Sequence, residues 1–353
     1  MFSPISLYGV LNSLSNAVSD TETEAELNNL LELSQEKRNS FYKKAYLANS
    51  FKIDGVGNIE IHNGAFFTNE VPYSQEYVDT LTNLYTECFQ LDYMKDTDVD
   101  KLLTWAKERM RSDELSAKDI GIEQDHWDAF TLLSTLYFNT EWKVIFDKEN
   151  FQKDFYLQNG DKVQASFMEH EYMIRDSYQY DDYYSFSDSY SCNATINYIV
   201  PRNDKTIYDI VENYNIFENS EENLIPEINP ETYREIAIDI TMPEFKLDNE
   251  IDFESIMKNN NCGNMFDDTK YSFNNAFDHY FDRPVYVRKL FQKNSINLNK
   301  KGTEVKTVTT AHMGFGKAGD PHMMDYLDVY EVVLDKPFGY VIKDLNGIAL
   351  YAG

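Results

Sequence analysis

Histidines and cysteines, the side chains that most often carry catalysis or bind metals, are scattered along this sequence. The six histidines stand at no spacing typical of a hydrolase or a metalloprotease. They are His62, His126, His170, His279, His312 and His322. Met168-Glu169-His170-Glu171 contains metal-binding types of side chain, but its spacing does not make them converge. We interpret this segment as a solvated polar stretch.

Motifs for covalent or phosphate chemistry are also missing. None of the 14 glycines forms a GxGxxG turn or a P-loop, and the sequence has no GxSxG or HExxH motif. Cys88, Cys192 and Cys262 are far apart and unpaired, which suggests neither a zinc site nor a disulfide framework. The sequence therefore predicts a protein that is not an enzyme and that uses no metal or cofactor.

The charge of the chain restricts its partners. The 60 acidic and 32 basic residues give a formal net charge of -28. Such a surface repels phosphate backbones, so we expect no nucleic-acid partner. It could attract basic proteins, cationic proteases among them, although acidic charge more often serves solubility alone. No run of eighteen apolar residues occurs, so we expect no membrane-spanning segment.

The elements that must position any site are predicted to be helices first and strands later. Ser3 and Pro4 are typical of a helix N-cap and first turn, and apolar residues follow at helical spacing. The apolar run 130–138 is typical of a strand buried on both faces of a central sheet. The tyrosine-rich stretch 172–190 is interpreted as a solvated sheet segment. Further helices are expected over 23–33 and 98–111, and further strands over 59–67, 194–200, 235–247, 286–287, 295–298, 329–334 and 338–351.

This order lacks the regular strand–helix alternation of a doubly wound fold, so it predicts a mixed α+β fold. A length of 353 residues is compatible with one domain, residues 1–353. Six separated segments resemble, in the same order, the serpin family of serine protease inhibitors. They are residues 2–6 (FSPIS), 63–67 (NGAFF), 136–142 (LYFNTEW), 241–247 (TMPEFKL), 301–304 (KGTE) and 334–338 (LDKPF).

The resemblance implies three β-sheets, about nine helices and an exposed reactive loop at about residues 301–326, with Trp142 at the top of the main sheet. It implies a suicide substrate for a serine-type endopeptidase, which cleaves the loop and is trapped as an acyl-enzyme while the loop inserts into that sheet. It also implies a monomer whose partner is a target protease. The chain is expected to lack part of the family's first helices, and its localisation stays open, with secretion slightly favoured by the family.

The residues of this loop can be tested for insertion, because a central strand must bury small uncharged side chains on one face. One face would hold Thr303, Val305, Thr307, Thr309 and Ala311. The other, expected to meet solvent, would hold Gly302, Glu304, Lys306, Val308 and Thr310. The segment contains no proline, and threonine and valine favour strands. It is predicted to insert, although Val305, Lys306 and Thr307 replace small residues of the family and could slow insertion.

The glycine-rich stretch 313–321 is predicted to be the cleavable part of the loop. Counting forward from the hinge places the reactive bond at Gly316–Lys317. Phe315 would suit a chymotrypsin-like protease and Lys317 a trypsin-like one. Counting backward from residues 336–338 gives Tyr326 instead, because this loop is about ten residues longer than is usual in the family. We follow the forward count, since trapping depends on the length that inserts.

A polar cluster beneath the main sheet is also implied by the resemblance. Ser3 and Ser6 match the family, whereas Ser134 and Gln292 replace an asparagine and a histidine and could hydrogen-bond with each other. Two alternative functions stay open besides inhibition of a serine protease. One is a non-inhibitory serpin that acts as a binding or interaction protein, and the other is an inhibitor of cysteine proteases.

Overall fold

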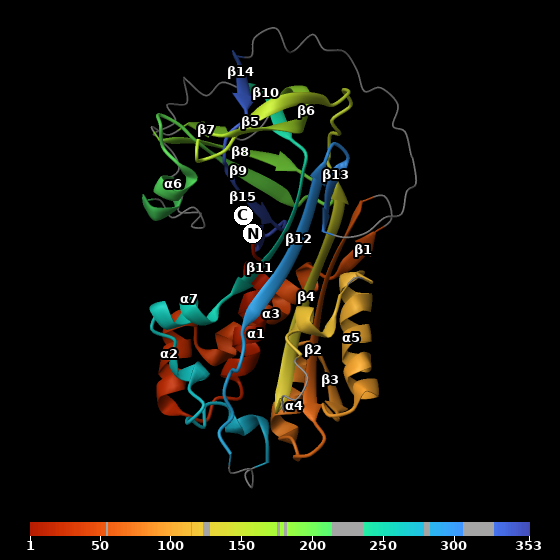
Figure 1. Ribbon diagram of the computed structural model, residues 1–353, viewed down its shortest axis with the longest axis vertical. Coiled ribbons are helices and arrows are strands. Elements are labelled where there is room, and N and C mark those ends of the chain that lie inside the picture. The colour runs from red at the N-terminus through yellow and green to blue at the C-terminus, as the bar shows by residue number, and fades with distance from the viewer. Residues whose placement is uncertain are drawn as a thin grey trace.

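The polypeptide folds into helices and three β-sheets, as the computed structural model of the chain shows (Figure 1). The described part contains seven α-helices, three short 3-10 helices and sixteen strands, a helix count slightly below the nine expected. The structure describes residues 1–53, 56–113, 115–122, 128–174, 177–179, 182–213, 236–278, 283–305 and 328–353.

The largest sheet has seven strands in the order β1-β2-β4-β13-β12-β11, with β3 paired to β2. The short strand β13 lies between β4 and β12 and pairs with both of them in antiparallel fashion. The bounds are β1 Phe51–Ile53, β2 Gly57–Thr68, β3 Thr86–Leu91, β4 Phe130–Glu141, β11 Phe245–Asp252, β12 Phe291–Asn299 and β13 Gly302–Val305.

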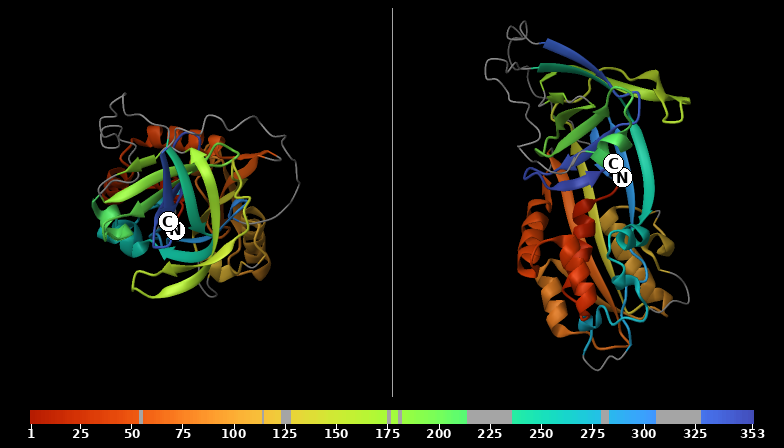
Figure 2. Two further views of the ribbon diagram at one scale, coloured as in Figure 1. Left: turned by 90° about the horizontal axis from the view of Figure 1, so that it is seen from above. Right: turned by 90° about the vertical axis from the view of Figure 1, so that its left-hand side faces the viewer.

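Two smaller sheets complete the β-structure at one end of the long sheet (Figures 1 and 2). The four-stranded sheet has the order β14-β10-β6-β5, with β5 Phe151–Tyr156, β6 Lys162–Ile174, β10 Ile236–Pro243 and β14 Asp328–Val333. The five-stranded sheet has the order β16-β15-β9-β8-β7, with β7 Ser177–Gln179, β8 Tyr183–Ser189, β9 Thr195–Pro201, β15 Gly339–Lys343 and β16 Ala349–Ala352.

The helices begin with α1, whose N-cap is Ser3 and whose first residue is Pro4, as predicted. The helices predicted over 23–33 and 98–111 are confirmed as α2 and α5 with shifted ends, whereas α3 and α4 are not among the predicted helices. The bounds are α1 Pro4–Ser15, α2 Thr21–Leu31, α3 Gln35–Ala48, α4 Gln75–Asn83, α5 Asp96–Met110, α6 Ile207–Asn213 and α7 Glu254–Asn259.

Three strand predictions differ from the structure. The stretch 338–351 forms two antiparallel strands, β15 and β16, separated by residues 344–348. The stretch 235–247 forms two strands in different sheets, because β10 ends at Pro243 and β11 begins at Phe245. The strand expected at residues 286–287 is wrong: these residues carry no strand and lead into β12. Two residues are too few to show the alternation of apolar and polar side chains that would distinguish a strand from an extended connection.

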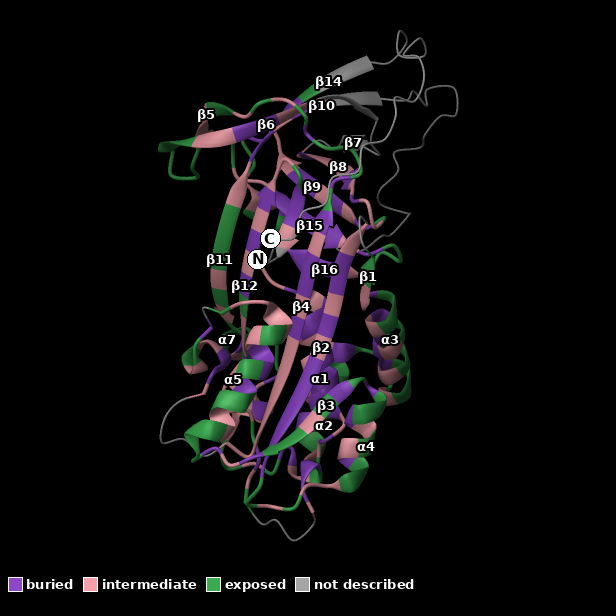
Figure 3. Ribbon diagram, turned by 90° about the vertical axis from the view of Figure 1, so that its right-hand side faces the viewer, coloured by how far each residue is buried: buried purple, intermediate pink, exposed green. Residues whose placement is uncertain are grey.

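Helices cover both faces of β4, which confirms the prediction for its apolar run. Leu132 packs against the cluster that contains Leu11 and Leu14 of α1, and Leu133 packs against the cluster that contains Trp105 of α5. Figure 3 shows α5 lying across one face of the sheet, and the side view in Figure 2 shows α1 on the other. Successive side chains of a strand point to opposite faces, so β4 separates two cores.

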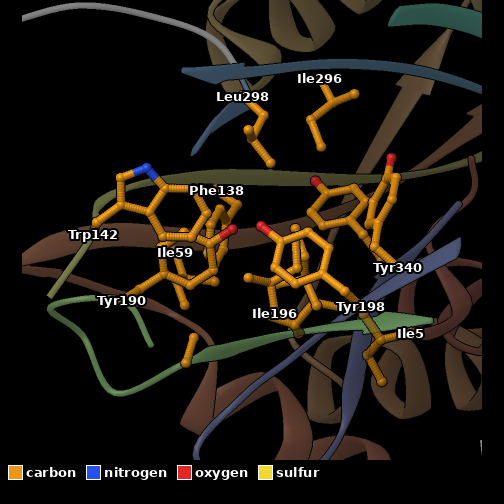
Figure 4. Close-up of a cluster of buried hydrophobic side chains, with 14 of the residues drawn as sticks. Ile5, Ile59, Phe138, Trp142, Tyr190, Ile196, Tyr198, Ile296, Leu298 and Tyr340 are labelled. Atoms are coloured by element: carbon orange, nitrogen blue, oxygen red, sulfur yellow. The ribbon is translucent and has the colours of Figure 1, made fainter. Parts of the chain in front are cut away.

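A third core joins the main sheet to the five-stranded sheet (Figure 4). Its aromatic side chains include Phe138 and Trp142 from the main sheet and Tyr190, Tyr198 and Tyr340 from the neighbouring sheet and its loops. Four residues of the stretch 172–190 are at most 5% exposed, so its interpretation as a solvated segment is wrong at these positions, which are Tyr183, Phe186, Asp188 and Tyr190. Aromatic burial here holds the two sheets together.

Replacing Phe67 with alanine is expected to lower the free energy of unfolding by about 3–5 kcal/mol. This ring is 1% exposed and stacks on Phe130 with centroids 5.6 Å apart, so its loss leaves a cavity. The matched control is Phe151→Ala on the edge strand β5, where the ring is 39% exposed. Urea unfolding of both variants measures the difference. Equal losses in the two variants would contradict this assignment of the core.

Candidate functional site: the hinge strand and the slot below it

The strand β13 is the described part of the predicted loop hinge. Gly302 lies opposite Glu141 and Thr303 opposite Thr140 on β4, while Thr303 also lies opposite Leu298 on β12. Thr303 is 1% exposed, and its hydroxyl forms a 2.7 Å hydrogen bond with the hydroxyl of Tyr190. Burial raises the pKa of Tyr190 well above its ordinary value, so this phenol stays protonated. The hinge is therefore fixed at both its backbone and its side chain.

Trp142 lies at the end of β4 beside this hinge, as expected from the sequence. Its ring stacks on Tyr190 with centroids 4.7 Å apart and an interplanar angle of 12° (Figure 4). Its Nε1 donates to the carbonyl oxygen of Asn299 at 2.8 Å, and its backbone N–H donates to that of Lys301 at 3.0 Å. Trp142 thus connects β4 to the turn between β12 and β13, and the stack carries this connection to Thr303.

Gly302 is the point where β13 comes closest to β4. A Cβ atom at this position would lie 2.7 Å from the Cα of Glu141 and 3.0 Å from the carbonyl carbon of Thr140. Both neighbours are backbone atoms, which cannot move aside as a flexible side chain could. The hinge therefore requires glycine here because of close packing.

The other hinge residues are described only in part. Glu304 is half-buried, and one of its carboxylate oxygens is shielded from solvent, so the expectation of a solvent-facing side chain is correct only in part. Val305 is placed by its backbone opposite Phe138. The remaining predicted hinge and reactive-bond residues, Lys306, Thr307, Phe315, Gly316 and Lys317, lie outside the described residues.

The four residues of the predicted polar cluster lie on the wall of one cavity, and three of them are linked. The hydroxyl of Ser3 donates to that of Ser6 at 3.1 Å. The Gln292 side chain accepts from the Ser3 N–H at 2.6 Å and donates to the Ser3 carbonyl at 3.1 Å. The suggested bond between Ser134 and Gln292 does not form among the described contacts, because Gln292 is engaged by the backbone of Ser3. This pairing joins β12 to the start of α1.

Below β13 a cavity of about 780 Å³ lies between β4 and β12. We call this cavity the slot. Its walls include residues 130–136 of β4 and residues 291–295 of β12. One face is closed by α1 through Leu7, Val10 and Leu14, and the other by the end of α5 and the residues after it. In Figure 1 the two strands diverge below β13. On β4 the lining of the slot ends at Leu136, two positions from Phe138, the residue opposite Val305.

The described histidines and cysteines do not form a site for a metal. Within the described ranges, no three histidine, cysteine, aspartate or glutamate side chains gather as a set of ligands. His170, the candidate of the sequence, packs its ring edge on Phe146 with centroids 5.6 Å apart. Likewise, no helix in the described part of the chain is both long and apolar enough to cross a bilayer.

Sequence reasoning missed Tyr190, the residue that holds the hinge from below. The signal was its alternation with Phe186 and Asp188, which are also buried along β8. The surrounding aspartates and serines concealed that period. The partner of Tyr190, Thr303, is 113 positions away, and no local pattern reports a contact at such a separation.

Comparisons with known proteins agree with this arrangement. A family model described as serpin (serine protease inhibitor) matches residues 1–353. Serpin-Z2B of Triticum aestivum is 23% identical over 373 aligned positions, which cover 100% of this chain and 88% of that protein. The solved structure of Arabidopsis AtSerpin1 in its native stressed conformation gives a TM-score of 0.81 at 19% identity, covering 100% and 90% of the two chains.

A second solved structure, human thyroxine-binding globulin complexed with thyroxine, gives a TM-score of 0.76 at 14% identity. The similarity covers 100% of this chain and 90% of the globulin. At these identities the structures show a common fold. They confirm the predicted mixed α+β fold with three β-sheets.

Thr303→Arg is expected to release β13 from the sheet, because burying an unpaired cation costs several kcal/mol. Release would expose Trp142 and shift its fluorescence to longer wavelength. The difference spectrum between each protein and its Trp142→Phe counterpart isolates this signal. Thr303→Val is the matched control: it loses only the hydrogen bond to Tyr190, about 1 kcal/mol, and should keep the emission of the parent. Unchanged emission from Thr303→Arg would show that the hinge is not held at this position.

Proposed function

We propose, on the premise that this chain belongs to the serpin family, that it inhibits a serine-type endopeptidase as a suicide substrate. The observation that carries the proposal is the slot below β13, bordered by two strands and closed by helices on its faces. In the proposed reaction the nucleophile belongs to the target protease, and this chain supplies the bait loop. Cleavage frees the loop to add a strand to the sheet, a form of strand addition for which serpins are a known example.

The register of β13 defines where an inserted strand would lie. Each residue of β13 pairs with β4 so that the two residue numbers add to 443, from Gly302 with Glu141 to Val305 with Phe138. Continuing that register places Lys306 opposite Tyr137 and Met313 opposite Phe130, the first residue of β4. Eight further residues therefore match the remaining length of β4, and those residues end where the glycine-rich stretch begins.

The same register assigns the faces of the inserted strand. Directly opposed residues of antiparallel strands share a face, so Thr307 would join Leu136, Thr309 would join Ser134 and Ala311 would join Leu132. Leu132 packs on the cluster of α1, so this face meets the core. Threonine and alanine side chains are small and uncharged, so they can be buried there.

The opposite face is not simply solvent. Lys306 would stand beside Tyr137, which is 1% exposed and over whose ring the Arg111 guanidinium lies at 4.3 Å. Arg111 also pairs with Glu60, the residue opposite Tyr137 on β2. The lysine would thus meet a cation and an anion together, and part of its repulsion from Arg111 is offset by Glu60.

The alternative of a non-inhibitory binding protein is favoured by one feature of the loop. Val305, Lys306 and Thr307 are bulkier than the small residues that the family has after its hinge, and slow insertion would let a protease complete hydrolysis. The fold is also compatible with ligand binding, since thyroxine-binding globulin shares it. Inhibition of a cysteine protease is a third candidate with the same loop mechanics.

The test of the proposal is incubation with chymotrypsin-like, trypsin-like and papain-like proteases, followed by denaturing gels. A complex that survives denaturation is expected with a serine protease, and mass spectrometry of the released C-terminal peptide is expected to place the bond at residues 315–317. A stable complex with the papain-like enzyme alone would instead support cysteine protease inhibition. Nicking by every protease without a complex would reject inhibition and favour the binding protein.

Cleavage in residues 313–321 is expected to raise the melting temperature by about 15 °C. Eight inserted residues would gain backbone hydrogen bonds worth on the order of 10 kcal/mol together, which corresponds to a shift of this size. Differential scanning calorimetry of intact and nicked protein measures the change. An unchanged melting temperature after complete nicking would contradict insertion.

Thr307→Arg is expected to abolish trapping while leaving cleavage intact. The arginine would have to enter the core face beside Leu136, and the cost of burying an unpaired charge would stall insertion before the acyl-enzyme is distorted. The protease should then cleave the variant at the parent rate and be released. Thr307→Ser keeps a small uncharged side chain and serves as the control. A gel-stable complex with Thr307→Arg in the parent yield would refute the assigned register.

A further inference from the structure

Arg38 of α3 is the one lysine or arginine that is buried among the residues that the structure describes, with 1% of its surface exposed. Its Nη1 donates to the side-chain oxygen of Asn28 at 2.8 Å and to the carbonyl oxygen of Leu33 at 2.7 Å. Both acceptors are neutral, and no carboxylate of the described residues bonds to this guanidinium. A buried charge is strongly unfavourable unless an opposite charge pairs with it.

One edge of the Arg38 guanidinium is left without an acceptor. The two bonds from Nη1 leave the edge formed by the N–H groups of Nε and Nη2, an edge that can hold an anion through two parallel hydrogen bonds. Nε is shielded from solvent and makes no hydrogen bond within the described part of the chain. Arginine has no acceptor of its own, so this edge requires one from elsewhere.

Tyr8 of α1 brings a further donor to the same face of α3. The helix α1 packs against both α2 and α3 (Figure 1). The Tyr8 ring stacks on Tyr42 with centroids 6.4 Å apart and meets the edge of Phe41 at 5.3 Å. Tyr42 follows Arg38 by one helical turn, so both point to the side of α3 that meets α1. The Tyr8 hydroxyl is shielded from solvent and has no hydrogen-bonding partner among the described residues.

The electrostatics of Tyr8 and Arg38 agree with this arrangement. Burial raises the pKa of Tyr8, and the charge of Arg38 lowers it. Burial also lowers the pKa of Arg38, while its interactions with Tyr8 and then Glu24 raise it. The phenol and the guanidinium are therefore close enough to affect each other. Glu24 is exposed, so water screens its charge, and the Leu33 carbonyl occupies only the Nη1 end of the guanidinium.

We propose that a small monovalent anion, of which chloride is the common one in biological fluids, binds between α1 and α3 at the free edge of Arg38 and the hydroxyl of Tyr8. One negative charge would neutralise the buried guanidinium and accept hydrogen bonds from both side chains. A water molecule could accept the same bonds but would leave the charge uncompensated. The lining of the slot includes neither Arg38 nor Tyr8, so the anion site does not depend on the proposed function.

The position of the anion is tested by crystallising the full-length protein with sodium bromide in place of chloride. Bromide scatters anomalously, so a bound ion is expected to give an anomalous difference peak within hydrogen-bonding distance of the Arg38 Nε and the Tyr8 hydroxyl. Density for a water molecule at this place, without an anomalous signal, would overturn the site.

Binding in solution is tested by the melting temperature as sodium chloride replaces sodium gluconate at constant ionic strength. The parent is expected to show a saturable rise of about 2 °C once chloride reaches ten times its dissociation constant. Arg38→Met should lose this rise, because it removes the charge and the free edge. Arg109→Met is the matched control: Arg109 pairs with Glu87 on α5's side of the sheet, and this variant should keep the rise.

Tyr8→Phe provides a second variant that keeps the stacked ring and removes only the hydroxyl. The dissociation constant for chloride is expected to increase about fivefold, the effect of one lost hydrogen bond. If Arg38→Met does not fold, this variant decides: an unchanged dissociation constant would refute the site. A parent without a saturable rise, or a rise of the same size in Arg38→Met, would show a general effect of salt and would also refute it.

Discussion

Along the edge of β4 that faces β12, the backbone N–H and C=O groups need hydrogen-bonding partners. The arrangement of the surrounding elements depends on which of these groups β13 pairs with. Buried N–H and C=O groups are costly when unpaired. Among the residues that the structure describes, the four of β13 pair with the upper end of β4, and the slot borders residues 130–136. On one side of that edge stands α1, and on the other stand α5 and the residues that follow it. The sheet thus has a strand position between β4 and β12, and β13 occupies its upper end.

The filled end and the lower end are stabilised in different ways. At the top, Thr303, Tyr190 and Trp142 are buried and joined by a hydrogen bond and a ring stack. At the bottom, Asp119 and Lys293 form a pair whose side chains are 22% and 40% exposed. Buried aromatic contacts resist water and salt, whereas exposed pairs contribute little and are screened. The hinge at the upper end is therefore fixed more firmly than the contact between Asp119 and Lys293 at the lower end.

Local patterns predicted the parts of this structure that depend on neighbours in the sequence. The Ser3–Pro4 cap gave the start of α1, and the apolar run gave β4, because capping and two-sided burial leave a direct trace in residue types. The alternation along the hinge predicted a buried face, and Thr303 lies on that face. The split at Pro243 was missed because both strands have the same alternating pattern, and only their partners differ.

The candidate site was less predictable because its contacts join distant segments. Gln292 and Ser3 are 289 positions apart, and Lys293 and Asp119 are 174 apart. Whether Gln292 bonds to Ser134 or to the backbone of Ser3 depends on the distance between β4 and β12. That distance is set by tertiary packing and leaves no local pattern in the sequence. The six segments that resemble serpins indicated the family of the chain. Each match is weak alone, but six matches in the same order along the chain are specific.

Gly302 also determines which side of the sheet each following residue would face if β13 were extended. Because no Cβ fits beside the backbone of Thr140 and Glu141, β13 cannot slide by one residue without a clash. A slip of one would exchange the two faces of every following residue. The glycine therefore sets the parity of any strand that continues the register of β13: odd-numbered residues up to 311 would face the core, and even-numbered ones would face α5. In the proposed mechanism, added residues beyond position 313 would lengthen the loop without changing which residues between 303 and 311 face the core.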